Sequence, residues 1–505
     1  MTVTDGYLVA CFVGLLLSST RWLRVAQREH YLPSSASRFS LRWWRLGIVN
    51  PLLFLVAVIA VVASAWFPSA CLVTASVVSI GPIGLGLKGR TSSLMWTRRL
   101  RTVAAAALLL ACILFLLLRQ LELGSAGYSF VALLVPVFID VALTVLKPIE
   151  QRFARQYVVR AAATLDRVNP IRVAITGSYG KTTIKGYVRH LLSETHSVVA
   201  SPASFNNSAG LSRSVNEHLN DGTEIFVAEM GTYGPGEIAD LVSWVQPSIS
   251  VLAAIGPVHL ERFGDLDRIV ASKSEIFSTS RTAVVNIDAY GLAAEANRLQ
   301  ASGINVLKCS AKDPTADIFV TSKEGLTVSV SNRQVVAGLP SDAAATNVAC
   351  AVAVAVALEV PDTTIAHRLT DLPSVDHRRQ VLTSPAGVTI IDDTYNSNPA
   401  GAAAALNTLS RIDANRKVVV TPGMVELGKR QVTENRRFGV DASLLADDLL
   451  IVGRTNKAAL ANGARDGTAR VHLLPNRDEA TKWVRENLKP GDAVLYENDL
   501  PDHYA

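Results

Sequence analysis

Long apolar segments are confined to the first third of the chain. Five of them approach the roughly 20 residues that a helix needs to span a membrane, and they cover residues 6–18, 46–67, 71–87, 102–118 and 128–146. The second and the fifth are the most convincing by length, whereas the third contains four glycine or proline residues and is the weakest. The pattern predicts a transmembrane domain of about five helices over residues 1–148.

Charged residues around these segments predict their orientation. Arginines, and no small-residue cleavage site, follow the first segment, so we expect an uncleaved anchor rather than a signal peptide. Basic residues fill the loops after the first and third segments, namely Arg21, Arg24, Arg28, Arg38, Arg42 and Arg45, then Lys88, Arg90, Arg98, Arg99 and Arg101. The positive-inside rule makes both loops cytoplasmic. We therefore expect a multi-pass protein of the inner cell membrane, with its N-terminus outside and everything after Lys147 in the cytosol.

Two features near the end of this region have alternative interpretations. Asp140 is a charge within the fifth segment, where it is either functional or reaches the interface or a partner helix. Residues 149–170 form a predicted juxtamembrane linker helix, whose Arg152, Arg155 and Arg160 could contact anionic membrane lipids. A solvated linker helix fits this segment equally well.

The rest of the chain alternates short β-type runs with helical patterns. The runs are IRVAIT, EIFVAEM, SISVLAAI and TAVVNID, followed by VTIIDD, KVVVTP, LLIVG and DAVLYE. This alternation is typical of α/β domains with parallel sheets. We expect one α/β domain over residues 171–361, including β-hairpins near residues 304–336 and a buried helix near 343–357. A smaller Rossmann-like domain would cover residues 362–505, with a hinge near residue 362.

Composition and charge narrow the class of protein. The chain is 49% hydrophobic with a mean hydropathy of +0.27. Residues 1–150 hold 13 Lys or Arg against 5 Asp or Glu, and the remainder holds 36 against 38. The basic character thus belongs to the membrane part and does not indicate nucleic acid as a partner. The five cysteines show no metal-ligand spacing, and we interpret them as reduced packing residues.

A glycine turn after the first β-type run carries the clearest chemical signal. The stretch TGSYGKTT follows IRVAIT and opens a helical pattern, so backbone amides, the helix dipole and a lysine would converge on one anion. It is shorter than the common G-x-x-x-x-G-K-[ST] loop. The candidate phosphate-binding residues are Gly177, Ser178, Tyr179, Gly180, Lys181, Thr182 and Thr183.

Two further residues come at the ends of predicted strands. Glu229 ends EIFVAEM and His259 follows SISVLAAI, so both would lie at the carboxyl edge of the sheet beside the loop. That placement suits Mg²⁺ and phosphate. Taken singly, such a glutamate is usually solvated and such a histidine usually structural.

The ordered set of motifs resembles the Mur ligases, ATP-dependent amide-forming enzymes of peptidoglycan synthesis, and within them the MurF branch. The resemblance runs from about residue 171 to 497. Besides TGSYGKTT, its motifs are FNNSAGL at 205–211, VAEMGTYGPGEI at 227–238, GPVHLERFGDLDRIVASKSEIF at 256–277, NID at 286–288, DHRRQ at 376–380, IDDTYNSNP at 391–399 and MVELG at 424–428.

The resemblance implies a role for each catalytic residue. Lys181 would hold the ATP phosphates, and Thr182 and Glu229 would bind one Mg²⁺. His259 would serve a second metal together with Lys273, which matches the family's carbamoylated lysine. An unmodified Lys273 paired with Glu275 or Asp267 is the alternative.

The resemblance also implies the remaining nucleotide contacts. Asn286 and Asn347 would approach the adenine, Arg378 the phosphates and Asp393 the ribose. Arg378 stands in an arginine pair, so a surface role is the alternative for it. The last two residues come from the C-terminal domain, and domain closure would then complete the site.

The implied reaction joins a carboxylate to an amine through an acyl phosphate. Membrane segments stand where MurF enzymes have a uridine-binding domain, and acidic residues occupy a basic region near residues 497–500. We therefore expect a lipid-linked or membrane-proximal carboxylate substrate and an amino acid or peptide amine. Envelope-synthesis proteins are candidate partners. The alternatives are a synthetase of an amino-acid polymer such as polyglutamate, a degenerate ligase that docks partners, and an ATP-driven transporter.

Overall fold

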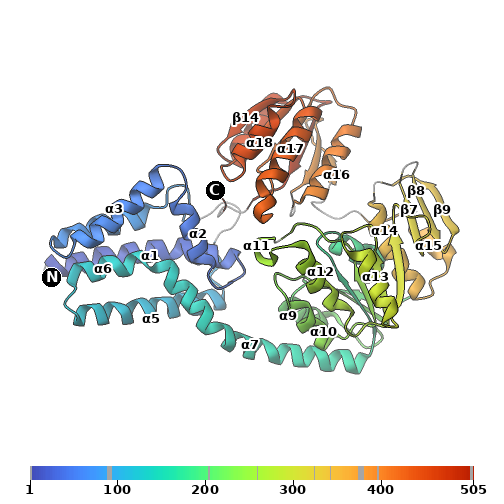
Figure 1. Ribbon diagram of the computed structural model, residues 1–505, viewed down its shortest axis with the longest axis horizontal. Helices are drawn as coiled ribbons and strands as arrows, with labels where there is room; N and C mark the ends of the chain where they lie inside the picture. Colours follow the sequence, from blue (N-terminus) through green and yellow to red (C-terminus); the bar gives the residue numbers. More distant parts are fainter. Residues whose placement is uncertain are drawn as a thin grey trace. The chain divides into compact units, whose positions relative to one another are not determined.

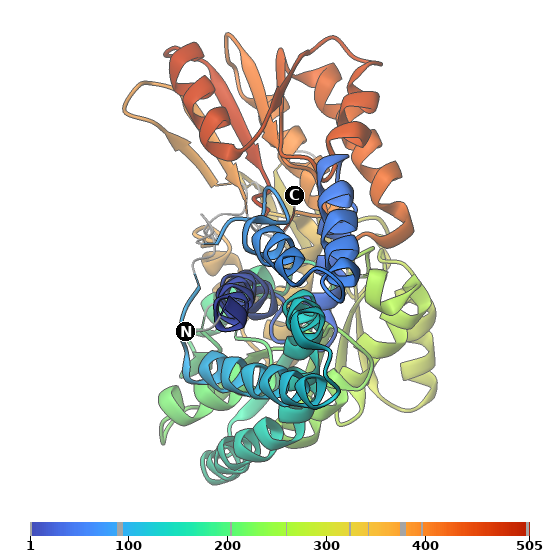
Figure 2. The ribbon, with the colours of Figure 1, turned by 90° about the vertical axis from the view of Figure 1, so that its left-hand side faces the viewer.

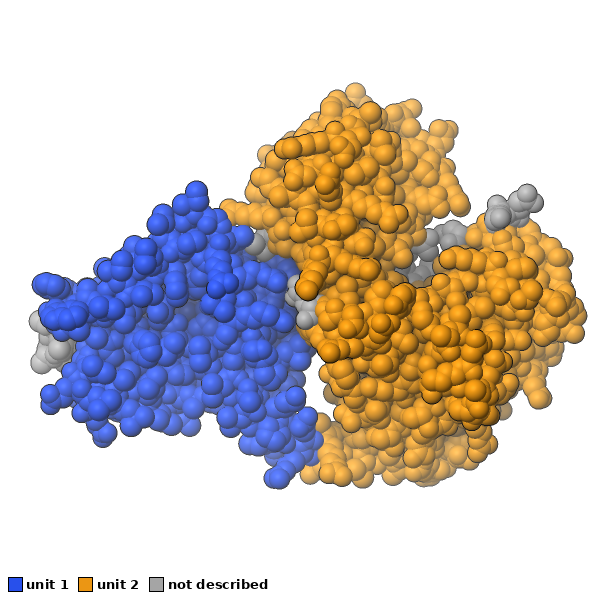
Figure 3. Space-filling model, viewed as in Figure 1, with its two compact units in different colours: residues 1–153, 500–505 blue, residues 154–499 orange. Residues whose placement is uncertain are grey.

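The computed structural model describes residues 3–87, 94–202, 205–258, 260–322, 325–341, 343–373, 380–394, 397–500 and 504. The chain divides into two compact units, coloured separately in Figure 3. One unit contains Met1–Phe153 together with Leu500–Ala505, and the other contains Ala154–Asp499. The final residues, which we expected to belong to the C-terminal domain, therefore group with the N-terminal unit.

The described part of the N-terminal unit consists of helices and contains no strand (Figures 1 and 2). Its buried side chains, such as Leu15, Trp22 and Ile139, form one main core. Its helices are α1 (Val3–Arg28), α2 (Ser35–Trp44), α3 (Val49–Ala63), η1 (Pro68–Ala70), α4 (Cys71–Ile80), α5 (Arg98–Gln120), α6 (Gly124–Leu133) and the first part of α7 (Val135–Val168).

Fewer of these helices are long enough to span a membrane than the sequence suggests. Among the described residues, Gly6–Arg28 and Arg98–Gln120 qualify singly. If each of the two bent pairs, α2 with α3 and α6 with α7, counts as one span, this part of the chain has up to four candidate spans. The third predicted segment forms only the ten-residue α4, because its glycines and proline end the helix. The predicted linker helix is also not separate, since α7 runs without interruption to Val168 with Pro148 inside it.

Described residues from both basic segments lie at the same end of the N-terminal unit. Gln27, at the end of α1, exchanges hydrogen bonds of 2.7 and 3.0 Å with the backbone of Met95, just before α5. The Arg99 guanidinium lies 4.2 Å from the centre of the Tyr31 ring and donates a 3.0 Å hydrogen bond to Glu150 on α7. The helix that leads to the second unit therefore leaves the first at its basic end.

Two of the buried charges in this unit cap helices. Asp140 accepts hydrogen bonds of 3.1 and 2.8 Å from the backbone amides of Ala36 and Ser37, at the start of α2. Arg21 donates to the carbonyl oxygens at the end of α4, including 2.9 Å to Gly81. Each charge has the sign that complements its helix end, so Asp140 has the structural role of contacting a partner helix.

The first domain of the second unit is built on a nine-stranded sheet in the order β2-β3-β1-β4-β5-β6-β7-β8-β9. The strands from β2 to β7 are parallel, and β8 and β9 extend the sheet as the predicted antiparallel hairpins. The strands are β1 (Ile171–Thr176), β2 (Val198–Ala200), β3 (Ile225–Glu229), β4 (Ile249–Leu252), β5 (Thr282–Asn286), β6 (Asn305–Ser310), β7 (Ile318–Thr321), β8 (Leu326–Val330) and β9 (Arg333–Leu339).

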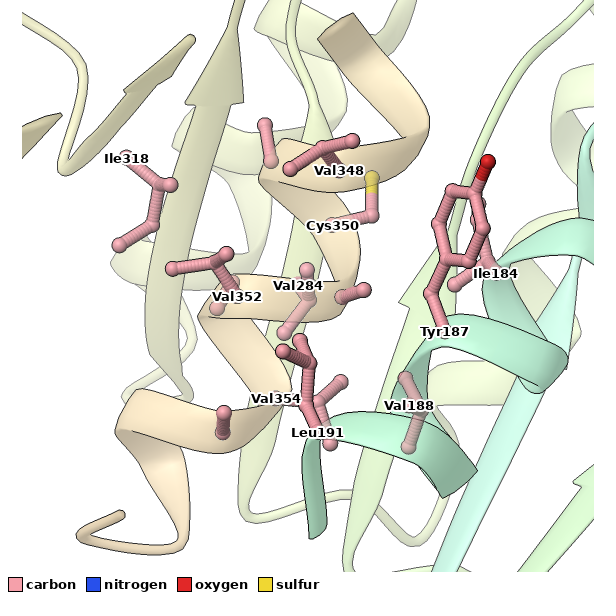
Figure 4. Close-up of a cluster of buried hydrophobic side chains, with 14 of the residues drawn as sticks. Ile184, Tyr187, Val188, Leu191, Val284, Ile318, Val348, Cys350, Val352 and Val354 are labelled. Atoms are coloured by element: carbon pink, nitrogen blue, oxygen red, sulfur yellow. The ribbon is translucent and has the colours of Figure 1, made fainter. Parts of the chain in front are cut away.

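Helices cover both faces of this sheet. One face packs against α8 (Lys181–Leu192), α14 (Ala345–Ala357) and α15 (Asp362–Arg368). Figure 4 shows this core, with Leu191 of α8 near Val354 of α14, and Val352 of α14 pointing toward Ile318 of β7. The other face carries the end of α7 with α9 (Ser208–His218), α10 (Glu237–Val245), α11 (Leu260–Phe263), α12 (Leu266–Ser274), η2 (Glu275–Phe277) and α13 (Leu292–Ala301).

The change of domain comes later than residue 362, where the sequence analysis placed it. Ile365 and Leu369 of α15 are buried in the core of the first domain, and Leu372 packs against that core. Pro361 caps α15 and does not mark a linker. The first domain thus extends through Leu372.

The second domain contains a six-stranded sheet in the order β10-β11-β15-β12-β13-β14. Its strands are parallel except for β10 (Gln380–Thr383), which runs antiparallel to β11 (Thr389–Asp393). The others are β12 (Lys417–Thr421), β13 (Asp448–Val452), β14 (Arg470–Leu474) and β15 (Ala493–Glu497). One face carries α16 (Pro399–Arg411), η3 (Gly428–Arg430), α17 (Gln431–Leu445) and α18 (Lys457–Ala464), and the other carries α19 (Arg477–Asn487). The predicted α/β class is confirmed.

Candidate active site

The phosphate loop joins β1 to α8, and hydrogen bonds and side-chain packing hold it in place. Lys181 Nζ donates a 2.8 Å hydrogen bond to the carbonyl oxygen of Gly177, so the side chain folds over the loop. Ser178 N donates 2.8 Å to Ala254 O, which fixes the loop to the segment after β4. The ring of Tyr179 fills the space above Gly256. The loop therefore presents Lys181 and the start of α8 to an anion.

Gly180 ends the phosphate loop in a conformation that favours glycine, and it lies against Asn347. Its φ is +80°, a left-handed conformation that favours glycine. A Cβ atom at this position would lie 2.5 Å from Asn347 Oδ1. The first turn of α14 thus brings Asn347 against the loop, as the sequence analysis expects for a nucleotide contact.

Thr182 and Glu229 meet as predicted. Thr182 Oγ1 donates a 3.0 Å hydrogen bond to Glu229 Oε2, and the carboxylate is 1% exposed at the end of β3. Lys185, one turn after Lys181 on α8, forms a 3.0 Å ion pair with the same oxygen. Asn206 donates 3.3 Å to Oε1. The sequence analysis missed Lys185 and Asn206, although the spacing of the two lysines and the FNNSAGL motif point to them.

This group of oxygens fits a magnesium ion. A buried carboxylate next to a threonine hydroxyl supplies the hard oxygen ligands that Mg²⁺ prefers, and the ion pair with Lys185 shows that the carboxylate accommodates a cation. Among the described residues, no three His, Cys, Asp or Glu side chains gather as a metal site by themselves. A metal here would thus also need ligands from nucleotide phosphates or from a modified residue.

Lys273 lies in the last turn of α12 and is 5% exposed. Burial, and then the nearby positive charge of Lys181, lower the pKa of Lys273 well below its ordinary value. The ion-pair alternative is not supported, because Glu275 accepts from the amides of Gly236 and Ala239 at 2.8 and 3.0 Å. Asp267 instead accepts a 3.0 Å hydrogen bond from Tyr290. Lys273 is thus held as an amine that readily becomes neutral.

Asn286 is buried at the end of β5 and holds neighbouring strands together. Its Nδ2 donates a 2.7 Å hydrogen bond to Ala253 O, and its Oδ1 accepts from the amide of Asp288 at 3.2 Å. Ala253 in turn lies next to Gly177 in the phosphate loop. Asn286 therefore supports the loop from behind, and its contact with adenine remains a prediction.

Asp393 ends β11 beside Glu497, its partner in the register with β15. Glu497 is fully buried and accepts hydrogen bonds from the hydroxyls of Ser397 and Thr421. Burial raises the pKa of Glu497 to about 7, and the charge of Asp393 adds to this effect. Asp499 also forms an ion pair with Arg477. The acidic residues near 497–500 are thus engaged by partners within their own domain. The role of Asp393 at a ribose stays a prediction.

Two predicted site residues, His259 and Arg378, lie outside the described residues. The others divide into two groups. Lys181, Thr182, Glu229 and Asn347 contact the phosphate loop or one another, and Lys273 lies within the electrostatic reach of Lys181. Asp393 belongs to the second domain. The fold and the first group define a nucleotide-dependent enzyme with a phosphate loop at the carboxyl edge of a parallel sheet.

Comparisons with known proteins agree with this class. Residues 175–355 match the Mur ligase middle domain, and residues 377–496 match the Mur ligase, glutamate ligase domain. A UDP-N-acetylmuramoyl-tripeptide–D-alanyl-D-alanine ligase from Mycobacterium bovis is 32% identical over 359 residues, covering 64% of this chain and 69% of the relative. The chain therefore belongs to the Mur ligase family, and it is an ATP-dependent ligase with MurF-like sequence and fold.

Solved structures support the same assignment. The MurF ligase from Thermotoga maritima in complex with ADP has a TM-score of 0.59 and 26% identity, covering 68% of this chain and 80% of that one. A MurF from Acinetobacter baumannii has a TM-score of 0.60 and 24% identity, covering 68% and 77%. The second comparison bears on the fold alone.

Proposed function

We propose that this protein is a membrane-anchored ligase that uses ATP to join a carboxyl group of a peptidoglycan-type precursor to the amine of an amino acid or peptide. The observation that carries the proposal is the convergence of Lys181, Glu229 and Lys273 at one edge of the sheet. This set combines an anion site, a candidate metal ligand and a buried amine. Positive charge and hydrogen-bond donors at such a site stabilise the negative charge that develops in phosphoryl transfer to a carboxylate.

The exposed surface of the helical unit supports membrane anchoring. Large apolar side chains of α3 and α5 face outward, including Leu52 at 56%, Ile59 at 57% and Leu116 at 57% exposure. Because each is a little more than half exposed, leaving it in water rather than in an apolar medium would cost about 1–2 kcal/mol. Trp66 follows α3 and Trp96 precedes α5, positions typical of aromatic residues at a membrane interface. These features favour helices inserted in lipid.

The orientation follows from charge. The basic loops and the start of the segment leading to the ligase domains share one end of the helical unit, and basic ends of spanning helices face the cytoplasm. The ligase domains would then lie where ATP is available. An N-terminus outside and a multi-pass arrangement remain parts of this proposal.

The residues of the loop would position the reactants. Lys181 and the amides at the start of α8 would hold the ATP phosphates, and Thr182 with Glu229 would hold Mg²⁺, which offsets the negative charge gathered in phosphoryl transfer. The substrate carboxylate attacks the γ-phosphorus and ADP departs, leaving an acyl phosphate. The amine nitrogen then attacks the acyl carbon, phosphate leaves with the bonding electrons, and the amine gives up a proton to form the amide.

Lys273 would act as a carbamate. A neutral amine adds to the carbon of CO₂ and loses one proton, which produces an anionic group with two oxygens. A neutral amine is what the buried position of Lys273 favours. The product would replace a positive charge beside Lys181 with a negative one and would supply an oxygen ligand for a metal. His259 and Arg378 complete the proposed catalytic set.

The carboxylate substrate is proposed to be lipid-linked or membrane-proximal. The matched relatives are named for a UDP-linked muramoyl tripeptide and D-alanyl-D-alanine, whereas the family match in this chain begins after the apolar helices, at residue 175. A ligase held at the membrane has access to a substrate that is itself held there.

The test uses the full chain purified in detergent. UDP-linked and lipid-linked precursors are each combined with amino acids and dipeptides, and ADP release and product mass are measured. We expect continued, multiple-turnover ADP release only when both a carboxylate and an amine are present, because without the amine the reaction stops at the acyl phosphate. One amide should form per ATP, and a Lys181→Ala control should form none. ATP hydrolysis that needs neither substrate would contradict the proposal, and a product ladder would instead favour the polymer synthetase.

A further inference from the structure

The proposed reaction gives no role to Lys185, a buried lysine on the helix that follows the phosphate loop. Lys185 comes four residues after Lys181, so both side chains project from the same face of α8. Lys181 Nζ folds back onto the carbonyl oxygen of Gly177. Lys185 Nζ instead reaches the carboxylate of Glu229 at the end of β3. Lys185 thus places a positive charge on the candidate metal ligand.

The carboxylate of Glu229 accepts hydrogen bonds from three side chains in the described part of the chain. Lys185 Nζ and Thr182 Oγ1 each lie 3.0 Å from Oε2, and Asn206 Nδ2 lies 3.3 Å from Oε1. Of these three donors, Lys185 alone is charged. The side chains of Lys185 and Glu229 are only 7% and 1% exposed, so water and salt screen the ion pair little. The charge of the carboxylate is therefore already matched by a buried ammonium group.

This ion pair changes how the carboxylate attracts a metal ion. A divalent ion that uses Glu229 as a ligand must share it with the Lys185 ammonium group, and like charges repel strongly in a poorly solvated site. The triphosphate of ATP brings oxygen ligands and negative charge of its own. A metal ion that arrives with ATP has these charges to offset the ammonium group, whereas a free metal ion does not.

We propose that Lys185 sets the order of binding at this site, because by neutralising Glu229 it disfavours a free divalent ion and favours the metal complex of ATP. The inference rests on the metal-binding role of Glu229 in the proposed function. Lys185 acts through Glu229 and is a positioning residue, not a catalytic one. A site with this property takes up its metal ion with each ATP and does not keep one after the nucleotide has left.

Binding of Mn²⁺ alone to the full chain in detergent tests the proposal, with free Mn²⁺ followed by electron paramagnetic resonance in the absence of ATP. The decisive variant is Lys185→Met, which removes the ammonium group and keeps an apolar side chain of similar length. Lys185→Met/Glu229→Gln reports whether the ion binds at Glu229. Lys312→Met is the matched change at an exposed lysine.

A second variant leaves the ion pair in place. Asn206→Asp adds one negative charge next to Glu229 Oε1, so it should also strengthen the binding of Mn²⁺ alone. This variant keeps the proposal testable if Lys185→Met is too unstable to purify. An Asn206→Asp protein that binds Mn²⁺ alone no more tightly than the parent would then overturn the proposal.

We expect Lys185→Met to bind Mn²⁺ alone on the order of 100-fold more tightly than the parent. The double variant should lose this gain, and Lys312→Met should match the parent. Equal affinities of the parent and Lys185→Met for Mn²⁺ alone, or a gain that persists in the double variant, would overturn the role of Lys185.

The same measurement with ATP present separates this inference from the ligase proposal. If Glu229 is a metal ligand, Glu229→Gln should weaken the binding of Mn²⁺ together with ATP, and unchanged binding would contradict the proposed function. If Glu229→Gln weakens that binding but Lys185→Met gains nothing with Mn²⁺ alone, the ligase proposal stands and the role of Lys185 is overturned.

Discussion

Replacing Lys273 by methionine tests how burial prepares this residue for reaction. Methionine keeps the apolar volume of the side chain and removes only the amine. At pH 7.4 a lysine with the ordinary pKa near 10.4 is neutral in about one molecule in a thousand, so deprotonation costs roughly 4 kcal/mol. Burial and the charge of Lys181 lower the pKa of Lys273, and each unit of lowering removes about 1.4 kcal/mol of that cost.

The expected consequence is a carbamate that forms on Lys273 and not on exposed lysines. The full chain in detergent is equilibrated with ¹³C-bicarbonate, and carbamate resonances are recorded by NMR across pH. One resonance should vanish in Lys273→Met and persist in Lys312→Met, a matched change at an exposed lysine. The difference between variants also separates it from the α-amino group, whose pKa near 7.7–8.0 allows the same reaction.

Lys273→Met should lower activity without lowering stability. We expect amide formation in Lys273→Met to fall on the order of 100-fold or more, with stability unchanged or raised because a buried ionisable group is gone. Removing CO₂ should inactivate the parent enzyme, and bicarbonate should restore it. Identical carbamate spectra for the parent and Lys273→Met, or full activity of that variant, would refute the reasoning.

Three other changes have expected outcomes. Lys185→Met removes the cation paired with buried Glu229, so thermal unfolding should show that the free energy of unfolding falls by about 3–5 kcal/mol. The double variant Lys185→Met/Glu229→Gln should recover most of this stability but should remain inactive. A Lys185→Met variant with the parent's melting temperature would count against the ion pair. Gly180→Ala introduces a Cβ 2.5 Å from Asn347 Oδ1 at a φ of +80°, a strain of about 1–2 kcal/mol from the backbone alone; Asn347→Ala should relieve the steric part in a melting experiment, whereas a normal midpoint for Gly180→Ala would be contrary evidence. Glu497 has a folded-state pKa of about 7 against an ordinary 4.5, so between pH 4.5 and 7 the folded state holds a proton that the unfolded state has lost. The free energy of unfolding should therefore fall by roughly 3 kcal/mol as pH rises across this range. Urea titrations should show that Glu497→Gln removes the dependence, and equal pH profiles for the parent and the variant would contradict it.

Strands with continuous apolar runs could be predicted from the sequence, and irregular ones could not. The runs that became β1, β3 and β13 are buried along nearly their whole length. β2 has only three residues and β14 alternates exposed with half-buried positions, so neither has a hydrophobic pattern that stands out from a loop. Short edge strands are fixed by their neighbours rather than by their own composition.

The residues of the candidate site also divide into those that the sequence locates and those that it does not. The glycine turn, Lys181 and Glu229 could be located because each follows a recognisable strand. Lys185 and Asn206 were missed, although one follows Lys181 by a helical turn and the other lies in FNNSAGL. Their partner Glu229 is 44 and 23 residues away, so their contact with it forms only in the folded sheet. The boundary that the sequence analysis placed after residue 148 also falls inside a helix, because α7 continues through Pro148 to Val168.

The most direct test of the account follows oxygen from the substrate carboxylate into phosphate. The full chain in detergent is given ATP, an amine and a precursor whose reacting carboxyl group carries ¹⁸O, and the released phosphate is analysed by mass spectrometry. The account predicts that each phosphate gains a single oxygen from that carboxyl group, because the carboxylate attacks the γ-phosphorus and the amine later breaks the acyl carbon–oxygen bond. Phosphate that carries no label while amide accumulates would contradict it.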